Sequence, residues 1–110
     1  MVTNDTLSDV FNQYYEELGG GKMPKGASGG STDMGDVSHV VPAIHPWIGL
    51  NCPAFNLHSK GFADATITPA ADRALQIGGQ ALALTAIDVL TRPELLDAIK
   101  AEFAEAQKEW

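Results

Sequence analysis

The spacing of apolar residues near the start of the chain predicts an amphipathic helix. Five of them fall at the i, i+3, i+4, i+7 and i+11 positions of one helical face: Leu7, Val10, Phe11, Tyr14 and Leu18. Thr6 is a candidate N-cap, and Gly19 is the expected stop because glycine favours the left-handed position after a helix. This helix must pack its apolar face on another element.

Two further helices are predicted in the last third of the chain. Thr68 and Pro69 stand in the favoured N-cap and N1 order, and the stretch to residue 90 is apolar on most of its faces, which predicts a helix buried on most of its faces. Residues 91–94 have capping-box spacing. The last helix carries one apolar stripe opposite a charged face, which predicts a surface element. The stripe consists of Leu95, Leu96, Ile99, Phe103 and Ala106.

The middle of the chain has weaker patterns. Glycine and proline predict an exposed loop over residues 19–30, and β-branched residues interrupted by Pro42 and Pro46 predict short strands at residues 40–41 and 44–50. Residues 59–66 fit a helical turn or coil. We therefore predict an α/β fold, with short strands packed against two or three helices. Because so few strands make a poor sheet, residues 1–110 are interpreted as the C-terminal part of a larger domain.

Charge and composition exclude several classes of partner. The formal net charge is −7 and only seven residues are Lys or Arg, which argues against nucleic-acid binding because phosphates require clustered basic side chains. The apolar stretch within residues 75–90 is interrupted and shorter than the roughly 20 residues of a membrane span, so no membrane partner is expected. With no signal sequence and a single cysteine, Cys52, a cytoplasmic protein is expected.

Two short segments carry the candidate chemistry. Asp33 follows a run of glycine, Ser31 and Thr32, whose amides and hydroxyls suit a carboxylate or phosphate, and His58 follows a turn in a polar setting where imidazole is a common metal ligand. From spacing alone, local turn hydrogen bonding is the favoured explanation of the first segment, and a surface or hydrogen-bonded histidine is the favoured explanation of the second. His39 and His45 are interpreted as structural residues.

The same segments resemble the C-terminal end of the M20 family of zinc-dependent peptidases and amidohydrolases, close to its aminoacylase and p-aminobenzoyl-glutamate hydrolase branch. The matching words, in chain order, are residues 30–38 (GSTDMGDVS), 41–42 (VP), 44–46 (IHP), 58–63 (HSKGFA), 81–86 (ALALTA) and 94–96 (ELL). As a collinear set they cover nearly the whole chain.

The resemblance implies hydrolysis of an amide or peptide bond in an N-acyl or aminoacyl amino acid or a dipeptide, using two zinc ions and a bridging water. Metal coordination makes hydroxide available from such a water near neutral pH. By the same resemblance, His58 corresponds to the last metal-ligand histidine. Ser31, Thr32 and Asp33 correspond to a loop that lines the substrate pocket.

The chain also departs from the family pattern. It has no His-x-Asp motif, its only histidines are His39, His45 and His58, and its glutamate-rich stretches lie on the amphipathic helices and do not match the Glu-Glu pair that carries the family's general base. We therefore expect no catalytic residue in this chain, an absent N-terminal half and lid domain, and inactivity unless a separate N-terminal chain completes the site.

Two alternatives remain at this stage. In the first alternative, the chain is a non-catalytic remnant or subunit, which self-associates as a homo-oligomer or completes a partner chain through its apolar surfaces. Or it is a small module that binds anions through residues 31–38, which the acidic net charge disfavours.

Overall fold

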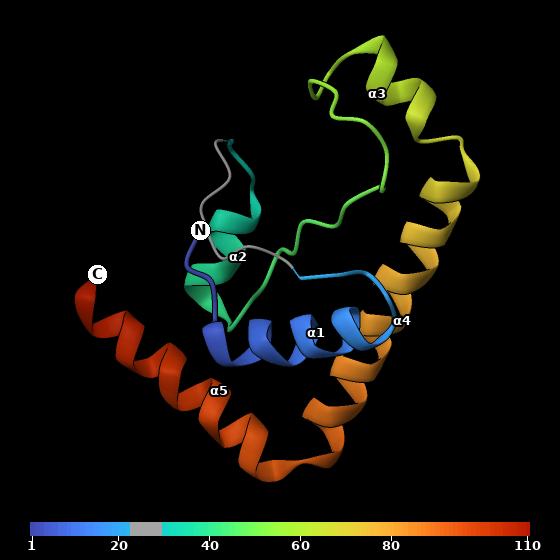
Figure 1. The fold of residues 1–110 in the computed structure, drawn as a ribbon. Coiled ribbons are helices and arrows are strands. Elements are labelled where there is room, and N and C mark those ends of the chain that lie inside the picture. Colours follow the sequence, from blue (N-terminus) through green and yellow to red (C-terminus); the bar gives the residue numbers. More distant parts are fainter. Residues whose placement is uncertain (23–29) are drawn as a thin grey trace.

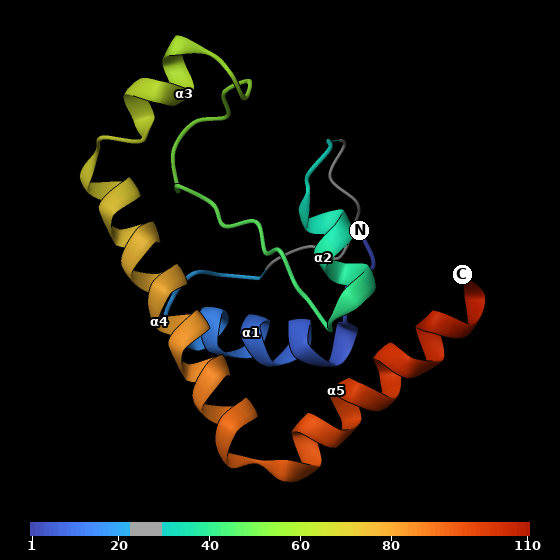
Figure 2. The same cartoon turned by 180° about the vertical axis from the view of Figure 1, so that it is seen from behind.

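The fold is entirely helical in the part of the chain that the structure describes. A computed structural model describes residues 1–22 and 30–110. The helices are α1 (Asp5–Glu17), α2 (Met34–Val40), α3 (Lys60–Ala65), α4 (Pro69–Thr91), α5 (Pro93–Ala106) and the 3-10 helix η1 (Gln107–Glu109) (Figure 1). Helices α4 and α5 form a V, and α1 crosses α4 (Figure 2). Most of the expected glycine loop, residues 23–29, lies outside the described residues.

The predicted α/β fold is wrong, because residues 1–22 and 30–110 contain no strand. Residue 40 belongs to α2, and residues 44–50 run as extended chain without a pairing partner. A strand is stable only when its amides and carbonyls pair with another backbone, and proline removes one donor at each of positions 42 and 46. The β-branched composition predicted a local preference for extended backbone, but the described ranges contain no neighbouring strand with which it could pair.

Helix α1 confirms the prediction made from its apolar stripe. Its N-cap is Asn4, not Thr6: the Asn4 side chain accepts a hydrogen bond from the Leu7 amide at 3.0 Å. The helix ends before Gly19, whose φ of +92° is the left-handed conformation that glycine adopts without strain.

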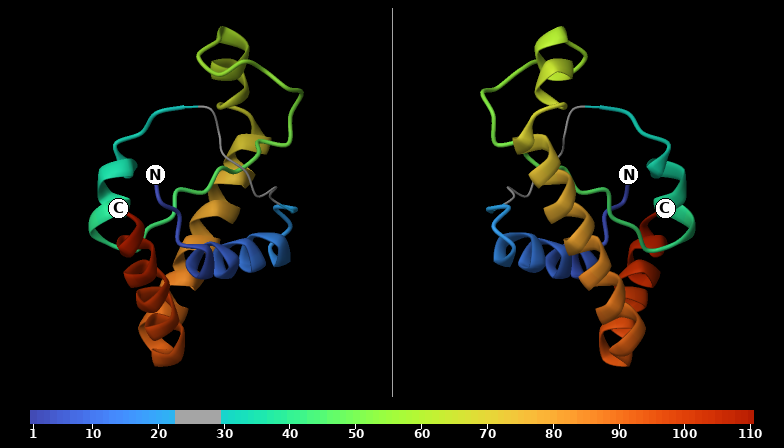
Figure 3. Two further views of the ribbon diagram at one scale, coloured as in Figure 1. Left: turned by 90° about the vertical axis from the view of Figure 1, so that its left-hand side faces the viewer. Right: turned by 90° about the vertical axis from the view of Figure 1, so that its right-hand side faces the viewer.

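The core forms where α1 crosses α4 (Figure 3). Phe11 and Tyr15 of α1 stack with ring centroids 5.8 Å apart, and they pack with Ile77 and Ala81 of α4. Ile48, from the extended segment, packs closely on buried Gly78. Small residues on this face of α4 allow the aromatic rings to approach its backbone, so α1 and α4 share most of the buried apolar surface.

Helix α4 begins as predicted, with the Thr68 side chain capping it and Pro69 in its first turn. The prediction that it is buried on most faces is wrong. Leu75 and Leu90 are 74% and 84% exposed, because only one side of the helix meets α1. By length and composition, this 23-residue helix is also long and apolar enough to cross a membrane, although core helices of soluble proteins meet the same criterion. The expectation that the stretch is too short is therefore corrected.

Helix α5 is the expected surface element, with Leu95 and Ile99 buried on one side. The expected capping box is absent. Arg92 occupies the N-cap position without a side-chain cap, and the Thr91 hydroxyl donates back to the Ile87 carbonyl at 2.7 Å. Arg92 instead pairs with Glu94 at 3.0 Å, across the start of the helix.

Candidate functional site

The segment of residues 31–33 lies at the surface, immediately before α2. Thr32 closes the turn: its carbonyl accepts from the Gly35 amide at 3.1 Å, and its hydroxyl accepts from the Met34 amide at 3.3 Å. The side chains of Ser31 and Asp33 are exposed and make no hydrogen bond within residues 1–22 and 30–110. Local turn bonding thus accounts for Thr32, and it leaves the Asp33 carboxylate facing solvent.

Buried Ser38 holds α2 in place. Its hydroxyl donates to the Gly35 carbonyl at 2.7 Å and accepts from the Val2 amide at 2.9 Å. Because Ser38 is 0% exposed, both bonds are shielded from water. The start of the chain therefore fixes α2, and with it the adjoining segment of residues 31–33.

His58 is exposed on a tight turn before α3. Its φ of +61° is in the left-handed region, which a non-glycine residue seldom adopts. The next residue stabilises this turn, because the Ser59 hydroxyl donates to the Asn56 carbonyl at 2.6 Å and accepts from the Phe62 amide at 3.1 Å. The turn presents the imidazole to solvent, and neither ring nitrogen makes a hydrogen bond within residues 1–22 and 30–110.

A second contact shapes the same turn. The Phe55 ring lies against Gly61, where an added Cβ would stand 2.7 Å from the ring. A side chain at position 61 would therefore require the Phe55 ring, which is 45% exposed, to move aside.

The two candidate segments lie toward the same end of the molecule, away from the α4–α5 connection (Figures 1 and 3). No hydrogen bond or ion pair joins His58 to Ser31, Thr32 or Asp33 in the described part of the chain. Within that part, no group of three or more His, Cys, Asp and Glu side chains is arranged to hold a metal ion. These ranges alone therefore provide exposed single groups and not a closed metal centre.

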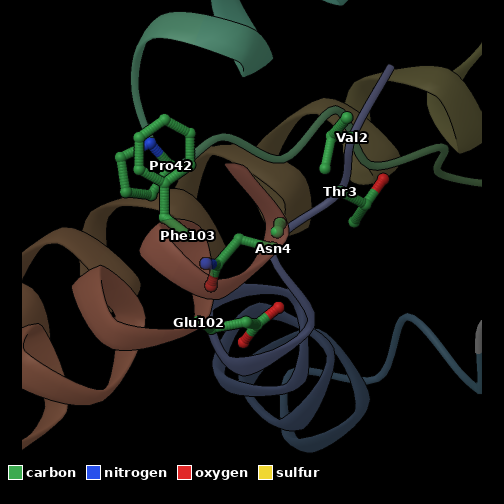
Figure 4. A pocket seen from close by; sticks show the side chains of 7 residues that line it. Val2, Thr3, Asn4, Pro42, Glu102 and Phe103 are labelled. Carbon is green, nitrogen blue, oxygen red and sulfur yellow. The ribbon is translucent and has the colours of Figure 1, made fainter. Parts of the chain in front are cut away.

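Neither of two hollows on the described surface includes the candidate residues. One, about 10 Å³, is large enough for roughly one water and lies between the N-terminal segment, Pro42 and α5 (Figure 4). The other is an open groove along the polar side of α1, which includes Glu16 and Glu17. Neither has the enclosed, mixed apolar and polar lining that small-ligand sites usually have.

The small hollow adjoins a polar junction that sequence reasoning missed. Asn4 is 4% exposed, and its amide donates to the Ile99 carbonyl at 3.0 Å. The Glu102 carboxylate accepts from the backbone amides of Asp5 and Thr6, the latter at 2.8 Å (Figure 4). An anion suits the N-terminus of α1 because the helix dipole and free amides point there. The residues of this junction are almost 100 positions apart in the sequence, so no local sequence pattern predicts that they meet.

Burial of Glu102 opposes its ionisation, but the hydrogen bonds from Thr6 and the Asp5 amide outweigh that effect. The pKa of Glu102 therefore lies below its ordinary value. The junction is thus stabilised by the charged carboxylate, and it connects α5 to the first turn of α1.

The other two histidines have aromatic neighbours. His39 donates from Nδ1 to the Gly35 carbonyl at 2.7 Å, and its ring centroid is 4.5 Å from that of Trp110. The rings of His45 and Trp47 are 6.4 Å apart. These contacts agree with the structural interpretation of both residues.

The sequence is similar to curated dipeptidases. It is 35% identical to mouse Xaa-Arg dipeptidase over 107 residues, which is 94% of this chain and 25% of that protein. It is 42% identical to human Xaa-Arg dipeptidase over 74 residues, or 67% of this chain and 17% of that protein. The chain thus spans a quarter or less of the length of these relatives. No family model and no solved structure matches it.

The similarity to these two dipeptidases supports the M20 resemblance in the broad sense. It does not identify the aminoacylase and p-aminobenzoyl-glutamate hydrolase branch.

Proposed function

We propose that this chain contributes part of the metal and substrate site of an M20-type hydrolase that cleaves the amide or peptide bond of a dipeptide or an N-acyl amino acid. The observation that carries the proposal is the similarity to Xaa-Arg dipeptidases along 94% of the chain, with His58 on an exposed, well-supported turn. The resemblance to the M20 motifs supplies the chemical interpretation of that residue.

In this proposal His58 supplies one imidazole ligand to a zinc site. Two zinc ions, when bound in a complete site, would activate a water molecule and polarise the scissile carbonyl. A catalytic zinc usually has three protein ligands, and the described part of this chain has no cluster of that size. His58 would therefore act together with ligands and a general base from another chain or segment.

Ser31, Thr32 and Asp33 are proposed to bind the substrate. The exposed hydroxyl of Ser31 is a donor suited to a substrate carboxylate, whereas the Asp33 carboxylate suits a cationic group such as an amine or guanidinium. Xaa-Arg dipeptides carry both kinds of group, which makes them the first substrates to test.

A metal-binding experiment tests the proposed role of His58. We expect the wild-type chain to bind zinc weakly in titration calorimetry, and the His58→Ala variant to lose that binding. His45→Ala is the matched control because His45 is also exposed on the extended segment. Equal zinc binding by all three proteins would remove His58 from the site.

A complementation assay tests the enzymatic part. Mouse Xaa-Arg dipeptidase lacking the quarter that this chain matches would be mixed with the chain, and hydrolysis of Xaa-Arg dipeptides and N-acyl amino acids would be measured. We expect activity only from the mixture, and none with His58→Ala. A folded mixture that binds zinc but remains inactive would instead favour the non-catalytic alternative.

A further inference from the structure

Helix α2 has little apolar packing to hold it in place. Its valines at positions 37 and 40 are 43% and 74% exposed, and Ser38 is the one residue of this helix that is buried. Ser38 is bound to the start of the chain through the Val2 amide. A second contact lies at the other end of the helix, where the ring centroid of His39 is 4.5 Å from that of Trp110. The position of α2 therefore depends on one buried hydrogen bond and one exposed ring contact.

Trp110 connects α2 to α5. Its indole meets the Phe103 ring edge-on, with centroids 6.0 Å apart and an interplanar angle of 74°. This geometry is favourable because the positive edge of one aromatic ring meets the negative face of the other. Trp110 is thus held by α5 on one side and contacts the last turn of α2 on the other.

The hydrogen bond of His39 determines which of its ring nitrogens can titrate. Nδ1 lies 2.7 Å from the Gly35 carbonyl oxygen, which can only accept, so Nδ1 carries a hydrogen. Nε2 is therefore the nitrogen that gains or loses a proton, and the exposed position of His39 leaves it open to water. Histidine ordinarily changes its charge between pH 5 and 8. Protonation makes the ring a cation without breaking the bond to Gly35.

A positive charge on the His39 ring strengthens both of its contacts. A cation near an indole ring is attracted by the electrons of that ring, and centroids 4.5 Å apart are within the range of this attraction. The Nδ1–H of an imidazolium also donates more strongly to the Gly35 carbonyl than that of a neutral imidazole. The contact between His39 and Trp110 should therefore be firmer at about pH 5 than at about pH 8.

The charged groups on the surrounding elements favour the positive form of His39. More of them are carboxylates than ammonium groups, and Lys108 is already paired with Glu105. Within residues 1–22 and 30–110, none of them forms an ion pair with His39. They are Asp33 and Asp36 on α2, Glu105, Lys108, Glu109 and the terminal carboxylate of Trp110, and the amino group of Met1 near Gly35.

We propose that His39 and Trp110 form a pH-sensitive latch, which holds α2 firmly when His39 is protonated and loosens when His39 is neutral. The latch acts on residues 31–33, because Asp33 occupies the N-cap position of α2 and the Thr32 carbonyl accepts from the Gly35 amide at 3.1 Å. His39 and Trp110 are then positioning residues for the substrate, a consequence that rests on the proposed function. The latch itself does not depend on that function.

Tryptophan fluorescence of the chain alone tests the latch. Trp47→Phe leaves Trp110 as the only tryptophan. An imidazolium in contact with indole quenches its emission more than a neutral imidazole does, so Trp110 should lose emission as the pH falls from about 8 to about 5. His39→Gln in the same background should abolish this loss, and His45→Gln, the matched control, should keep it. Emission that is independent of pH, or that falls equally in His39→Gln, would overturn the proposal.

Hydrogen exchange tests whether the latch holds α2. At about pH 5, Trp110→Ala should speed exchange of the α2 amides roughly two- to fivefold over the unsubstituted chain, with a smaller ratio at about pH 8. Trp47→Ala is the matched control because Trp47 and Trp110 are both 51% exposed. Circular dichroism establishes helicity, and Trp110→Phe replaces Trp110→Ala if the latter unfolds. Equal exchange in Trp110→Ala and the unsubstituted chain at both pH values would overturn the proposal.

Hydrolysis of Xaa-Arg dipeptides in the mixture with the truncated mouse enzyme tests the consequence for substrate. At about pH 6, Trp110→Ala should raise KM roughly two- to fivefold and leave kcat unchanged, because the latch positions the binding segment and touches no reacting atom. An unchanged KM would overturn the positioning role. An inactive mixture would count against the proposed function, and the latch would still stand or fall with the two measurements on the chain alone.

Discussion

Gly20 and Gly79 differ in the space that surrounds their α-carbons. A Cβ at Gly20 would stand 2.4 Å from ring atoms of Tyr15, which is itself 2% exposed and fixed in the core. A Cβ at Gly79 would extend into open space from the middle of α4. Sequence patterns mark both only as glycine, because the distinction depends on what lies opposite each α-carbon.

The two glycines lead to opposite predictions. Gly79→Ala should raise the free energy of unfolding by about 1 kcal/mol, because alanine has the higher helix propensity and nothing obstructs its methyl group. Gly20→Ala should lower it by about 1–3 kcal/mol, because the Tyr15 ring must move. Urea titration at low protein concentration measures both. Similar effects from the two substitutions would contradict the packing around Tyr15.

The buried side-chain amide of Asn4 makes two hydrogen bonds, and substitutions of Asn4 can separate their contributions to stability. Asn4→Ala should lower the free energy of unfolding by about 1–3 kcal/mol, since the cap on Leu7 and the bond to Ile99 are both lost. Asn4→Ser keeps an oxygen for the cap, but its side chain is too short to reach the Ile99 carbonyl, so its effect should be smaller. Thermal melting compares them, with Asn12→Ala as the control. Equal losses from Asn4→Ala and Asn4→Ser would assign all of the effect to the Ile99 bond.

At the scale of elements, periodicity predicted helices well and strands poorly. The helices at α1, α4 and α5 were predicted because 3.6-residue periodicity, caps and prolines are local signals. Helix α2 was missed because its valines suggested a strand, whereas the contacts of Ser38 that hold it involve residue 2. The extended segment at 44–50 has strand composition, but a sheet depends on a partner that local patterns do not reveal.

The junction of α1 and α5 should depend on pH through Glu102. Its pKa is lowered in the folded protein, so its contribution is present above the unfolded pKa and is lost as pH falls through the folded value. Glu102→Gln should lose about 1 kcal/mol at neutral pH. The difference between variant and wild type should then shrink as the medium becomes acidic. Urea titrations from neutral to acid pH measure it, and a difference constant with pH would contradict the role of the charge.

At the scale of the whole molecule, the core of α1 and α4 is the most firmly packed region. Within the described ranges, residues 44–58, which comprise the extended segment of residues 44–50 and the turns that follow it, donate no backbone hydrogen bond, whereas the amides inside α4 are paired along the helix. Sequence reasoning placed His58 after a turn in this segment, and Ser31, Thr32 and Asp33 after the glycine run. It could not determine how close His58 lies to residues 31–33, because that distance depends on long-range packing and not on spacing.

Hydrogen exchange should follow this division. The backbone amides of residues 44–58 should exchange far faster than the amides around Ala81 in the middle of α4. Exchange is fast where backbone amides are unpaired and exposed to water. Mass spectrometry of deuterated peptides measures the difference. Equal protection of both segments would indicate that the extended chain has found a strand partner.

The crossing of α1 over α4 also has a consequence for synthesis of the protein. Phe11 and Tyr15 leave the ribosome before their partners Ile77 and Ala81, which follow more than 60 residues later. At roughly 5–20 residues per second, the aromatic face of α1 waits about 3–13 s before α4 exists to cover it. During that interval the nascent chain presents two aromatic rings to whatever chaperone or neighbouring chain is at hand.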